Sequence, residues 1–516
     1  MILYKMNLMK QFLIALSFFF SSALFAQQQV PTPQWRPLYH FTPEKYWTND
    51  PNGLLYLNGV YQLYNQQNPY GINWGNMSWG HATSTDLIHW KHYDLAMPQG
   101  IVGTDTTMRF SGYAVWDKNN TSGLCKDSGC IVAIYTADQR PQHKESQFIA
   151  YSNDGGMNFT NYKGNPVLDL DKSDFRDPNV QWDEQLQKWL MVVSLPWENR
   201  VQFYNSPDLK NWNLLSEFGN AGLRGGIWEC PFFIKLPVEG TDKTKWVLVN
   251  SFQDSSKNDY EEYYVGDFDG KTFTNDNPAD KVLLVDHGDA LYAAIPWNNL
   301  PEGQHTYIGW MVPPEKQQTW PWKGQMSIPR DLSLRETKDG IRLIQNPAKV
   351  IKENLSKFSS KMVHLDNVKI QGAKDALDGE KITGNSYWLE AEMEVPQNTM
   401  AGFKIAEKKD KKGNITAATV IGFDASKNEV YVDRSNSGTE NINAKNLTQT
   451  MKVNSTNGKI KFEILFDKSS LEVFVNDGEQ VLTTYVYPGM DSDLLSAFSF
   501  GGQTLIKSLK VWDMAK

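Results

Sequence analysis

The sequence has few of the residues that build disulfide frameworks, transition-metal sites or nucleic-acid surfaces. Of its 516 residues, three are cysteine and eight are histidine, and no H-x-x-x-H or C-x-x-C pattern occurs. The formal net charge is -8 and no block of Lys and Arg is present, whereas a phosphate backbone requires a basic patch. We therefore expect no metal or other cofactor and no nucleic-acid partner.

The three cysteines leave one pairing open. In an oxidising compartment, Cys125 and Cys130 of "CKDSGC" could pair across a short loop, but two free thiols are an equal alternative. Cys230 is left single if that pair forms.

Long apolar runs are confined to the N-terminus. Lys5 and Lys10 precede an apolar stretch that ends near Ala26, which is the pattern of a secretory signal peptide over residues 1–26. No cysteine follows this stretch to accept a lipid, and no later apolar segment approaches the roughly 20 residues of a membrane-spanning helix. We expect an exported protein, periplasmic or secreted, without a membrane anchor.

Helical periodicity is also scarce. From about residue 50 to 335, strand-length segments rich in aromatic and β-branched residues are bounded by Gly, Pro, Asn or Asp. Four loose repeats each run from a strand through an acidic turn to a closing aromatic, namely Trp90, Phe159, Trp212 and Phe273. One closing aromatic per four-stranded unit is typical of β-propellers. With a further strand region at "YIGWM", the pattern predicts a five-bladed propeller over residues 30–345.

The pattern changes after this region. Residues 346–360, which include "NPAKVIKENLSKF", read as a connector helix with Pro near its start. Beyond them apolar and polar residues alternate, with Leu389, Ala391, Met393 and Val395 on one face of a strand and Ile460, Phe462, Ile464 and Phe466 on one face of another. One buried and one solvated face, with hairpin turns between strands, indicate an antiparallel β-sandwich over 361–516. The predicted fold class is all-β.

Three carboxylates lie in similar motifs: Asp50 in "WTNDPNG", Asp177 in "FRDPNV" and Glu229 in "GGIWECPFF". Each motif alone is as typical of a turn or strand edge, because Asn, Asp, Pro and Gly stabilise turns. In a propeller, however, the innermost strand of every blade faces the central channel, so acids remote in sequence can meet there. Cleavage of a glycosidic bond needs one acid to protonate the leaving oxygen and one carboxylate to attack the anomeric carbon or direct water at it.

These motifs, in this order, resemble glycoside hydrolase family 32, the β-fructofuranosidases that include invertases, inulinases and levanases. The resemblance covers essentially the whole mature sequence and includes "FSG" at 110–112. It implies a five-bladed propeller followed by a β-sandwich, with Asp50 as nucleophile, Glu229 as general acid/base and Asp177 as transition-state stabiliser. It also implies contacts with the terminal fructosyl unit by Asn49, Gln66, Trp74, Phe110, Ser111, Arg176 and Trp310.

Two positions depart from the family pattern. Many members follow E-C-P with Asp, where this chain has Phe232. In "DHGDALYAA" the family often has an acid at the fifth position, where this chain has Ala290, with Asp289 one place earlier. We expect these changes to alter the polar network near the acids and the contacts at the pocket rim.

The resemblance predicts a retaining hydrolase that releases fructose from levan, inulin, fructo-oligosaccharides or sucrose. Three alternatives are a fructosyltransferase that forms the same fructosyl-enzyme, a related propeller enzyme acting on arabinan or xylan, and a non-catalytic fructan-binding protein. "NDPNG" and "WEC" argue against the second, and the presence of all three acids argues against the third. An exported enzyme without a lipid anchor favours exo action, while linkage preference (β-2,6 or β-2,1) and oligomeric state stay open.

Overall fold

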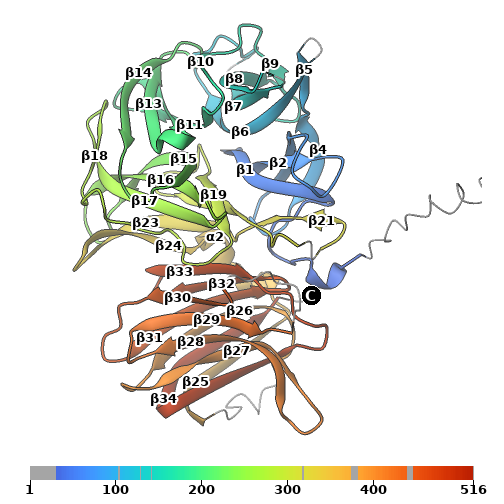
Figure 1. The fold of residues 1–516 in the computed structure, drawn as a ribbon, viewed down its shortest axis with the longest axis vertical. Coiled ribbons are helices and arrows are strands. Elements are labelled where there is room, and N and C mark those ends of the chain that lie inside the picture. Colours follow the sequence, from blue (N-terminus) through green and yellow to red (C-terminus); the bar gives the residue numbers. More distant parts are fainter. Residues whose placement is uncertain are drawn as a thin grey trace, which may run out of the picture.

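The computed structural model describes residues 31–102, 105–127, 129–140, 142–316, 319–372, 382–438 and 446–514. The expected signal peptide lies outside these ranges. Within them the chain is almost entirely β-structure, arranged as a wheel of sheets beside a second, layered domain (Figure 1). No helix in the described ranges is long and apolar enough to cross a membrane. The predicted all-β class is confirmed.

Five sheets form the blades of the propeller. Blade I contains β1 (Tyr46–Leu57), β2 (Val60–Asn68), β3 (Ser78–Ser84) and β4 (Lys91–Met97), and follows a short helical turn, η1 (Pro33–Trp35). Blade II contains β5 (Gly100–Val102), β6 (Asp105–Asp117), β7 (Cys130–Gln139), β8 (Lys144–Ser152), β9 (Thr160–Asn161) and β10 (Leu168–Lys172). Blade III contains β11 (Arg176–Asp183), β12 (Lys188–Leu195), the turn η2 (Pro196–Glu198), β13 (Arg200–Ser206) and β14 (Asn213–Gly219).

The last two blades complete the ring. Blade IV contains β15 (Gly226–Pro237), β16 (Thr244–Asp254), β17 (Asp259–Phe268) and β18 (Phe273–Asn275). Blade V contains β19 (Leu291–Pro296), β20 (Thr306–Met311), β22 (Gln325–Met326), β23 (Arg330–Thr337) and β24 (Gly340–Pro347). The innermost strands β1, β6, β11, β15 and β19 contact one another in that order, and β19 contacts β1. The five-bladed propeller is therefore confirmed.

Blade I receives the chain back at two places, and these close the wheel. β21 (Trp322–Lys323) pairs in parallel with β1, with Trp322 opposite Tyr46. The backbone of Asn298, just after β19, donates to the Leu54 carbonyl and accepts from the Tyr56 amide. Backbone hydrogen bonds thus join the last blade to the first, so the innermost strands form a continuous wall.

The connector between the domains differs from the sequence prediction. Instead of one helix over 346–360, the chain forms two single turns, α2 (Lys349–Lys352) and α3 (Leu355–Phe358). The break falls at Asn354, whose φ of -113° and ψ of 6° lie outside the helical region. Asn is unfavourable in the interior of a helix because its side chain competes for backbone hydrogen bonds.

The second domain is one hydrogen-bonded sheet folded into two layers, as in a β-sandwich. Its strands are β25 (Lys361–Gly372), β26 (Ser386–Glu394), β27 (Met400–Lys409), β28 (Ile415–Asp424), β29 (Glu429–Asn436), β30 (Thr448–Lys452), β31 (Lys459–Asp467), β32 (Ser470–Val475), β33 (Gln480–Tyr485) and β34 (Leu494–Asp513). The long strand β34 pairs with β27 through its first part and with β25 and β26 through its second. It therefore passes from one layer into the other.

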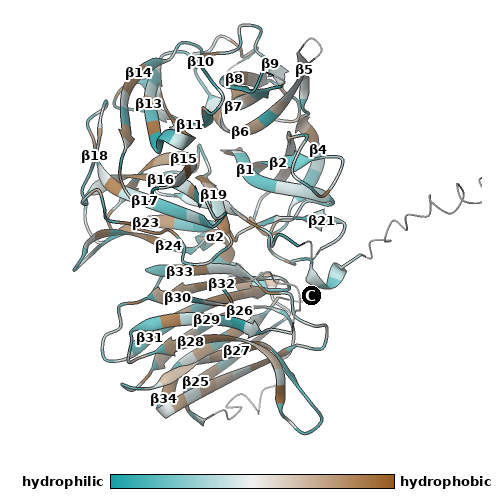
Figure 2. Ribbon diagram, viewed as in Figure 1, coloured by the Kyte–Doolittle hydropathy of each residue, from teal (hydrophilic) through white to brown (hydrophobic). Residues whose placement is uncertain are grey.

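Hydrophobic residues run along the strands of both domains (Figure 2). In the sandwich, the alternating residues of β26 and β31 are all buried in one cluster that lies between the layers. This is the face that the alternation predicts, since successive side chains of a strand point to opposite sides.

A buried charge network joins the two domains. Arg330 of β23 is fully buried and donates to Glu472 of β32 at 3.1 Å and to Asp286 at 3.1 Å. His40, ahead of β1, lies between two carboxylates of the sandwich, with Nδ1 2.9 Å from Asp467 and Nε2 2.9 Å from Glu472. A charge buried this deeply is tolerated only when it is paired, so these contacts fix how the sandwich seats against the propeller.

Candidate active site

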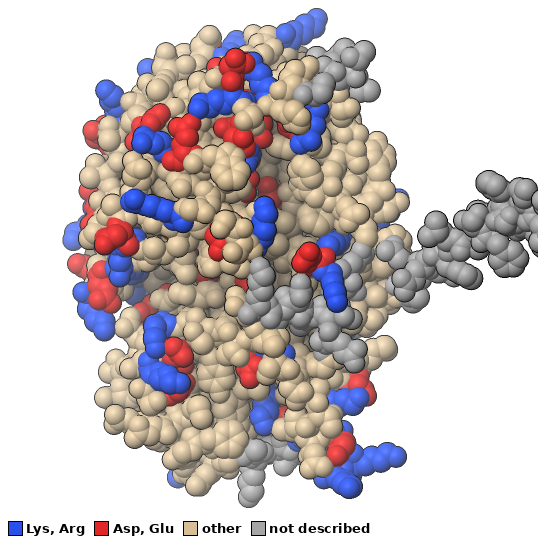
Figure 3. Space-filling view, in the orientation of Figure 1, with Lys and Arg blue, Asp and Glu red and all other residues tan. Residues whose placement is uncertain are grey.

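One pocket of about 390 Å³ lies at the mouth of the propeller channel and receives side chains from all five blades. All ten residues indicated by the sequence line it, namely Asn49, Asp50, Gln66, Trp74, Phe110, Ser111, Arg176, Asp177, Glu229 and Trp310. Four further lining residues are Arg140, Glu145, Gln253 and Tyr292. In the space-filling view, acidic atoms lie within the hollow of the wheel (Figure 3).

The innermost strands are irregular where they reach this pocket. The pairing register shifts between Thr48 and Pro51 in β1, Arg109 and Gly112 in β6, Arg176 and Asn179 in β11, Glu229 and Phe232 in β15, and Tyr292 and Ile295 in β19. Such bulges insert an extra residue and re-aim side chains. Asp177 and Cys230 accordingly have φ values of 67° and 45°, which side-chain-bearing residues rarely adopt. Backbone strain is thus accepted where it turns the acids toward the channel.

Asp50 is held by donors to both of its carboxylate oxygens. Ser111 Oγ donates to Oδ2 at 2.6 Å, and Asn49 Nδ2 donates to Oδ1 at 3.1 Å. Asn49 is itself fixed by the Trp47 indole N–H at 2.8 Å. Burial raises the pKa of Asp50, Ser111 opposes the rise, and the charge of Glu229 adds to it. The carboxylate is oriented by its neighbours.

Asp177 is buried at the start of β11 and is hydrogen-bonded to the strand that carries Glu229. The Cys230 backbone N–H donates to Asp177 Oδ2 at 2.9 Å, and the Cys230 thiol lies 3.6 Å from Asp50 Oδ2. Burial and the charge of Glu229 raise the pKa of Asp177 well above its usual range, although Arg176 opposes the rise. Cys230, a free thiol, thus contacts two acids and directly follows the third.

Glu229 is gripped on both oxygens. Arg176 Nε donates to Oε1 at 3.0 Å, and the Tyr292 hydroxyl donates to Oε2 at 2.8 Å. The same guanidinium pairs through Nη1 with Glu145 at 3.0 Å and Asp174 at 2.8 Å. Because a guanidinium can only donate hydrogen bonds whereas a hydroxyl can both donate and accept them, Tyr292 is the partner that suits Glu229 in either protonation state.

The channel is crossed beneath the acids. Asn298 Nδ2, just after β19 of blade V, donates to the Val180 carbonyl of blade III at 3.1 Å, and the Tyr113 hydroxyl of blade II donates to the Pro296 carbonyl of blade V. Along the innermost strands, these residues lie farther from the mouth of the pocket than the acids do. They join blades that are not neighbours in the ring, so the pocket is blind.

The four lining residues that sequence reasoning missed lie outside the acid motifs. Glu145, on β8, accepts from the Phe175 amide at 2.8 Å as well as from Arg176. Burial raises the pKa of Glu145 to about 7, although Arg176 opposes the rise. Tyr292 alone had a usable signal, since it lies in the family-like stretch "DALYAA". The others become apparent only when neighbouring strands are placed side by side.

The two departures from the family pattern lie outside the pocket lining, so Ala290 and Asp289 do not form the rim contacts expected of them. Asp289 accepts from Thr484 at 2.6 Å and Arg434 at 2.7 Å, both in the sandwich. Ala290 is buried in a cluster at the same junction, and Phe232 is buried in the core of blades IV and V. None of the three lines the pocket. The segment serves the domain interface because its strand, β19, enters the wheel from the sandwich side.

The alternative left open for Cys125 and Cys130 is decided, because the two residues form a disulfide. They lie at the start of β7 and in the loop before it, and neither lines the pocket.

Several carboxylates in a blind pocket, one of them held between a cation and a hydroxyl, can supply both the proton donor and the attacking group that glycosidic cleavage requires. The fold and the pocket together define a glycosidase of the propeller class.

Comparison with known proteins specifies the family. The model of the glycosyl hydrolases family 32 N-terminal domain matches residues 40–347, and that of the family 32 C-terminal domain matches 354–513. The chain therefore belongs to glycosyl hydrolase family 32.

The relatives agree with this assignment. The chain is 40% identical to a levanase of Bacillus subtilis over 503 residues, covering 93% of this chain and 71% of the relative. It is 36% identical to an extracellular exo-inulinase of Aspergillus awamori over 513 residues, covering 91% and 93%. A crystal structure of exo-inulinase from Aspergillus awamori superposes with a TM-score of 0.85 at 34% identity, covering 95% of this chain and all of that one.

Proposed function

We propose that this enzyme hydrolyses β-fructosyl bonds at the ends of fructans and fructo-oligosaccharides, and in sucrose, releasing fructose. The observation that carries the proposal is the convergence of Asp50, Asp177 and Glu229 in one blind pocket. Relatives named levanase, exo-inulinase and invertase, at 40%, 36% and 33% identity, support fructosyl substrates.

In the first step, Asp50 attacks the anomeric carbon of the terminal fructosyl unit. The bond to the leaving oxygen breaks, and that oxygen takes the proton of Glu229, which gives an ester between Asp50 and the sugar. Ser111 and Asn49 hold the attacking carboxylate in line. Asp177 accepts hydrogen bonds from sugar hydroxyls, and its negative charge stabilises the oxocarbenium-like transition state.

In the second step, Glu229 acts as a base. It removes a proton from water, which attacks the same carbon and releases Asp50, so the configuration is retained. Arg176 and Tyr292 keep the carboxylate of Glu229 in one place through both steps. Donors to a fixed acid of this kind are effective because no reorganisation is needed as charge moves.

The remaining lining residues hold the terminal fructosyl unit. Asn49, Gln66, Ser111 and Arg176 offer polar groups, and Trp74, Phe110 and Trp310 offer apolar faces. This mixture suits a sugar ring, whose hydroxyl groups project from an apolar framework.

The blind floor supports action at chain ends. A polymer could lie with its middle over the acids only in a groove open at both sides, whereas this pocket ends at the contacts of Asn298 and Tyr113. A terminal unit can enter it directly.

Export is part of the proposal. The N-terminal pattern of a signal peptide and the relatives named as extracellular support it. Mass spectrometry of the protein recovered outside the cytoplasm should find a chain beginning at Gln27. A chain that retains residues 1–26 there would contradict cleavage.

A substrate panel tests the activity. The protein would be incubated with levan, inulin and sucrose in parallel, and free fructose would be separated from oligomers over time. Fructose as the first product from a fructan is expected. Internal oligomers as first products would refute exo action, and tri- and tetrasaccharides as main products from concentrated sucrose would show a transferase instead.

A further inference from the structure

The rim of the active-site pocket is built from the turns between the second and third strands of the blades. In blade III, for example, Ser194 near the end of β12 lies opposite Arg176, which lines the pocket. The turn that follows β12 therefore lies at the mouth. The same reasoning places the β2–β3 turn of blade I at the mouth, since Asn68 lies opposite Trp47.

These two turns carry exposed aromatic rings. Tyr70 and Trp74 of blade I are 70% and 51% exposed, and Trp197 of blade III is 69% exposed. Trp74 lines the pocket itself, whereas Trp197 lies outside the lining and has no role in the proposed chemistry.

The side chain of Trp197 is exposed, but the backbone turn that carries it is held by its neighbours. It occupies the short helical turn η2, whose next residue, Glu198, pairs with Lys172 of blade II at 2.6 Å. Asn199 ends the turn with a φ of 47° and donates from Nδ2 to the Gly226 carbonyl of blade IV at 2.8 Å. Contacts with blades II and IV thus fix the turn that carries the ring, which lowers the entropy that a ligand would lose in ordering this segment.

The ring is also connected to the catalytic acids. Its side chain lies close enough to Asp174 to lower the pKa of that carboxyl, Asp174 pairs with Arg176 at 2.8 Å, and Arg176 binds Glu229. Burial opposes ionisation of Asp174, but hydrogen bonds from Arg176 and Ser173, together with the nearby side chain of Trp197, outweigh it and lower the pKa. Asp174 and Arg176 therefore link the neighbourhood of Trp197 to Glu229.

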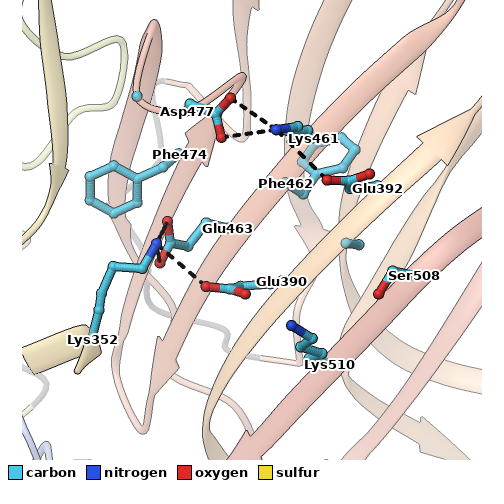
Figure 4. A pocket seen from close by; sticks show the side chains of 12 residues that line it. Lys352, Glu390, Glu392, Lys461, Phe462, Glu463, Phe474, Asp477, Ser508 and Lys510 are labelled. Carbon is cyan, nitrogen blue, oxygen red and sulfur yellow. Dashed lines mark hydrogen bonds and ion pairs between the residues drawn. The ribbon is translucent and has the colours of Figure 1, made fainter. Parts of the chain in front are cut away.

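A second pocket elsewhere in the described chain offers no comparable surface. It lies where α2 meets the outer face of the sandwich and has a volume of about 210 Å³ (Figure 4). Lys352 pairs there with Glu463 at 2.9 Å and Glu390 at 3.4 Å, and Lys461 pairs with Asp477 at 3.1 Å. Lys352 thus fastens the connector to the sandwich, and the pair of Lys461 with Asp477 lies within the sandwich.

We propose that Trp197 is a stacking platform for a sugar unit of the polymer that lies outside the pocket, beyond the bond being cleaved. This inference rests on the proposed function. The indole face covers the apolar C–H face of a sugar ring, as amphipathic aromatic side chains do at wet interfaces. Sucrose, with one unit beyond its fructosyl ring, is too short to use the platform, so Trp197 favours long fructans over the disaccharide.

Two substitutions at this position separate the possible roles. Trp197→Ala removes the platform, whereas Trp197→Phe keeps an aromatic face but lacks the indole N–H near Asp174. Phe500→Ala, on β34 of the sandwich, serves as a control because it truncates another exposed aromatic, 44% exposed, in the other domain. The kcat and KM of each variant would be measured with levan, inulin and sucrose, and thermal unfolding would confirm folding.

We expect Trp197→Ala to lower kcat/KM on the polymers by roughly three- to tenfold, mainly through KM. Sucrose hydrolysis stays within about twofold, since ground-state contacts outside the pocket act through KM on long substrates. Trp197→Phe keeps most of the polymer activity, and Phe500→Ala behaves as the wild type.

Equal losses on sucrose and polymer in both Trp197 variants would show that the residue only positions Asp174 and Arg176. Unchanged polymer kinetics in Trp197→Ala would show that it touches no substrate. Either result overturns the platform. Failure of the proposed function looks different, because the wild-type protein would then release no fructose from any of the three substrates.

Discussion

His40, at the interface between the two domains, predicts how the free energy of unfolding depends on pH. Burial disfavours the charged form of His40, but hydrogen bonds and charges from Asp467 and Glu472 outweigh it and raise the pKa to about 9, from 6.5 in an unfolded chain. The stabilisation from charged His40 is therefore complete below about pH 6.5 and is lost as the pH rises through about 9. At about 1.4 kcal/mol per pKa unit, the full contribution is about 3 kcal/mol.

Urea unfolding followed by tryptophan fluorescence at pH 6, 8 and 10 would measure this contribution. His40→Gln keeps a polar side chain but cannot carry the charge, so it isolates the titration of His40 from that of other groups, which are common to both proteins. The variant should be less stable than the wild type by about 3 kcal/mol near pH 6, and the difference should shrink toward pH 10. A difference that stays constant over this range would refute the assignment of a charged His40.

Three further predictions concern the pocket and the disulfide. Asp50→Asn should lose roughly 10⁴-fold or more in kcat while still binding fructan in calorimetry; unchanged turnover would reject Asp50 as nucleophile. Tyr292→Phe removes a hydrogen bond to a charged group worth about 1.5 to 3 kcal/mol, so kcat should fall about 10- to 100-fold with little change in KM, and a loss confined to KM would contradict this role. Cys125→Ser should leave kcat/KM unchanged and lower the free energy of unfolding by about 2 kcal/mol, as expected for so short a loop; an equal urea midpoint would speak against that estimate.

The propeller could be predicted from the sequence because its signal is local and repeated. The strands and the closing aromatic of a blade come from one continuous stretch of sequence. Trp90, Phe159, Trp212 and Phe273 therefore mark four blades without knowledge of long-range contacts. The sandwich could also be predicted, because the alternation of apolar and polar residues along β26 and β31 shows which face of each strand is buried. These predictions are confirmed.

The details of the site were less legible because they depend on long-range pairing. The positive φ of Asp177 and Cys230 arises from bulges in the ladders with β12 and β16, and no glycine marks either position. Glu145 reads as an ordinary charged residue of a strand, and its contact with Arg176 appears only when blades II and III lie together. The sequence suggests that Asp289 lies at the pocket rim. It cannot show that the segment before β19 contacts the sandwich instead.

The hydrogen bonds that cross the channel under the acids have a kinetic consequence. Because the channel is crossed below the acids, released fructose can leave only through the mouth of the pocket, which the shortened chain still occupies. The chain must withdraw after every turnover, so successive cuts fall on different molecules instead of running along one. Early in a digestion, the whole population should therefore shorten in step, and intact chains should not persist beside fully consumed ones.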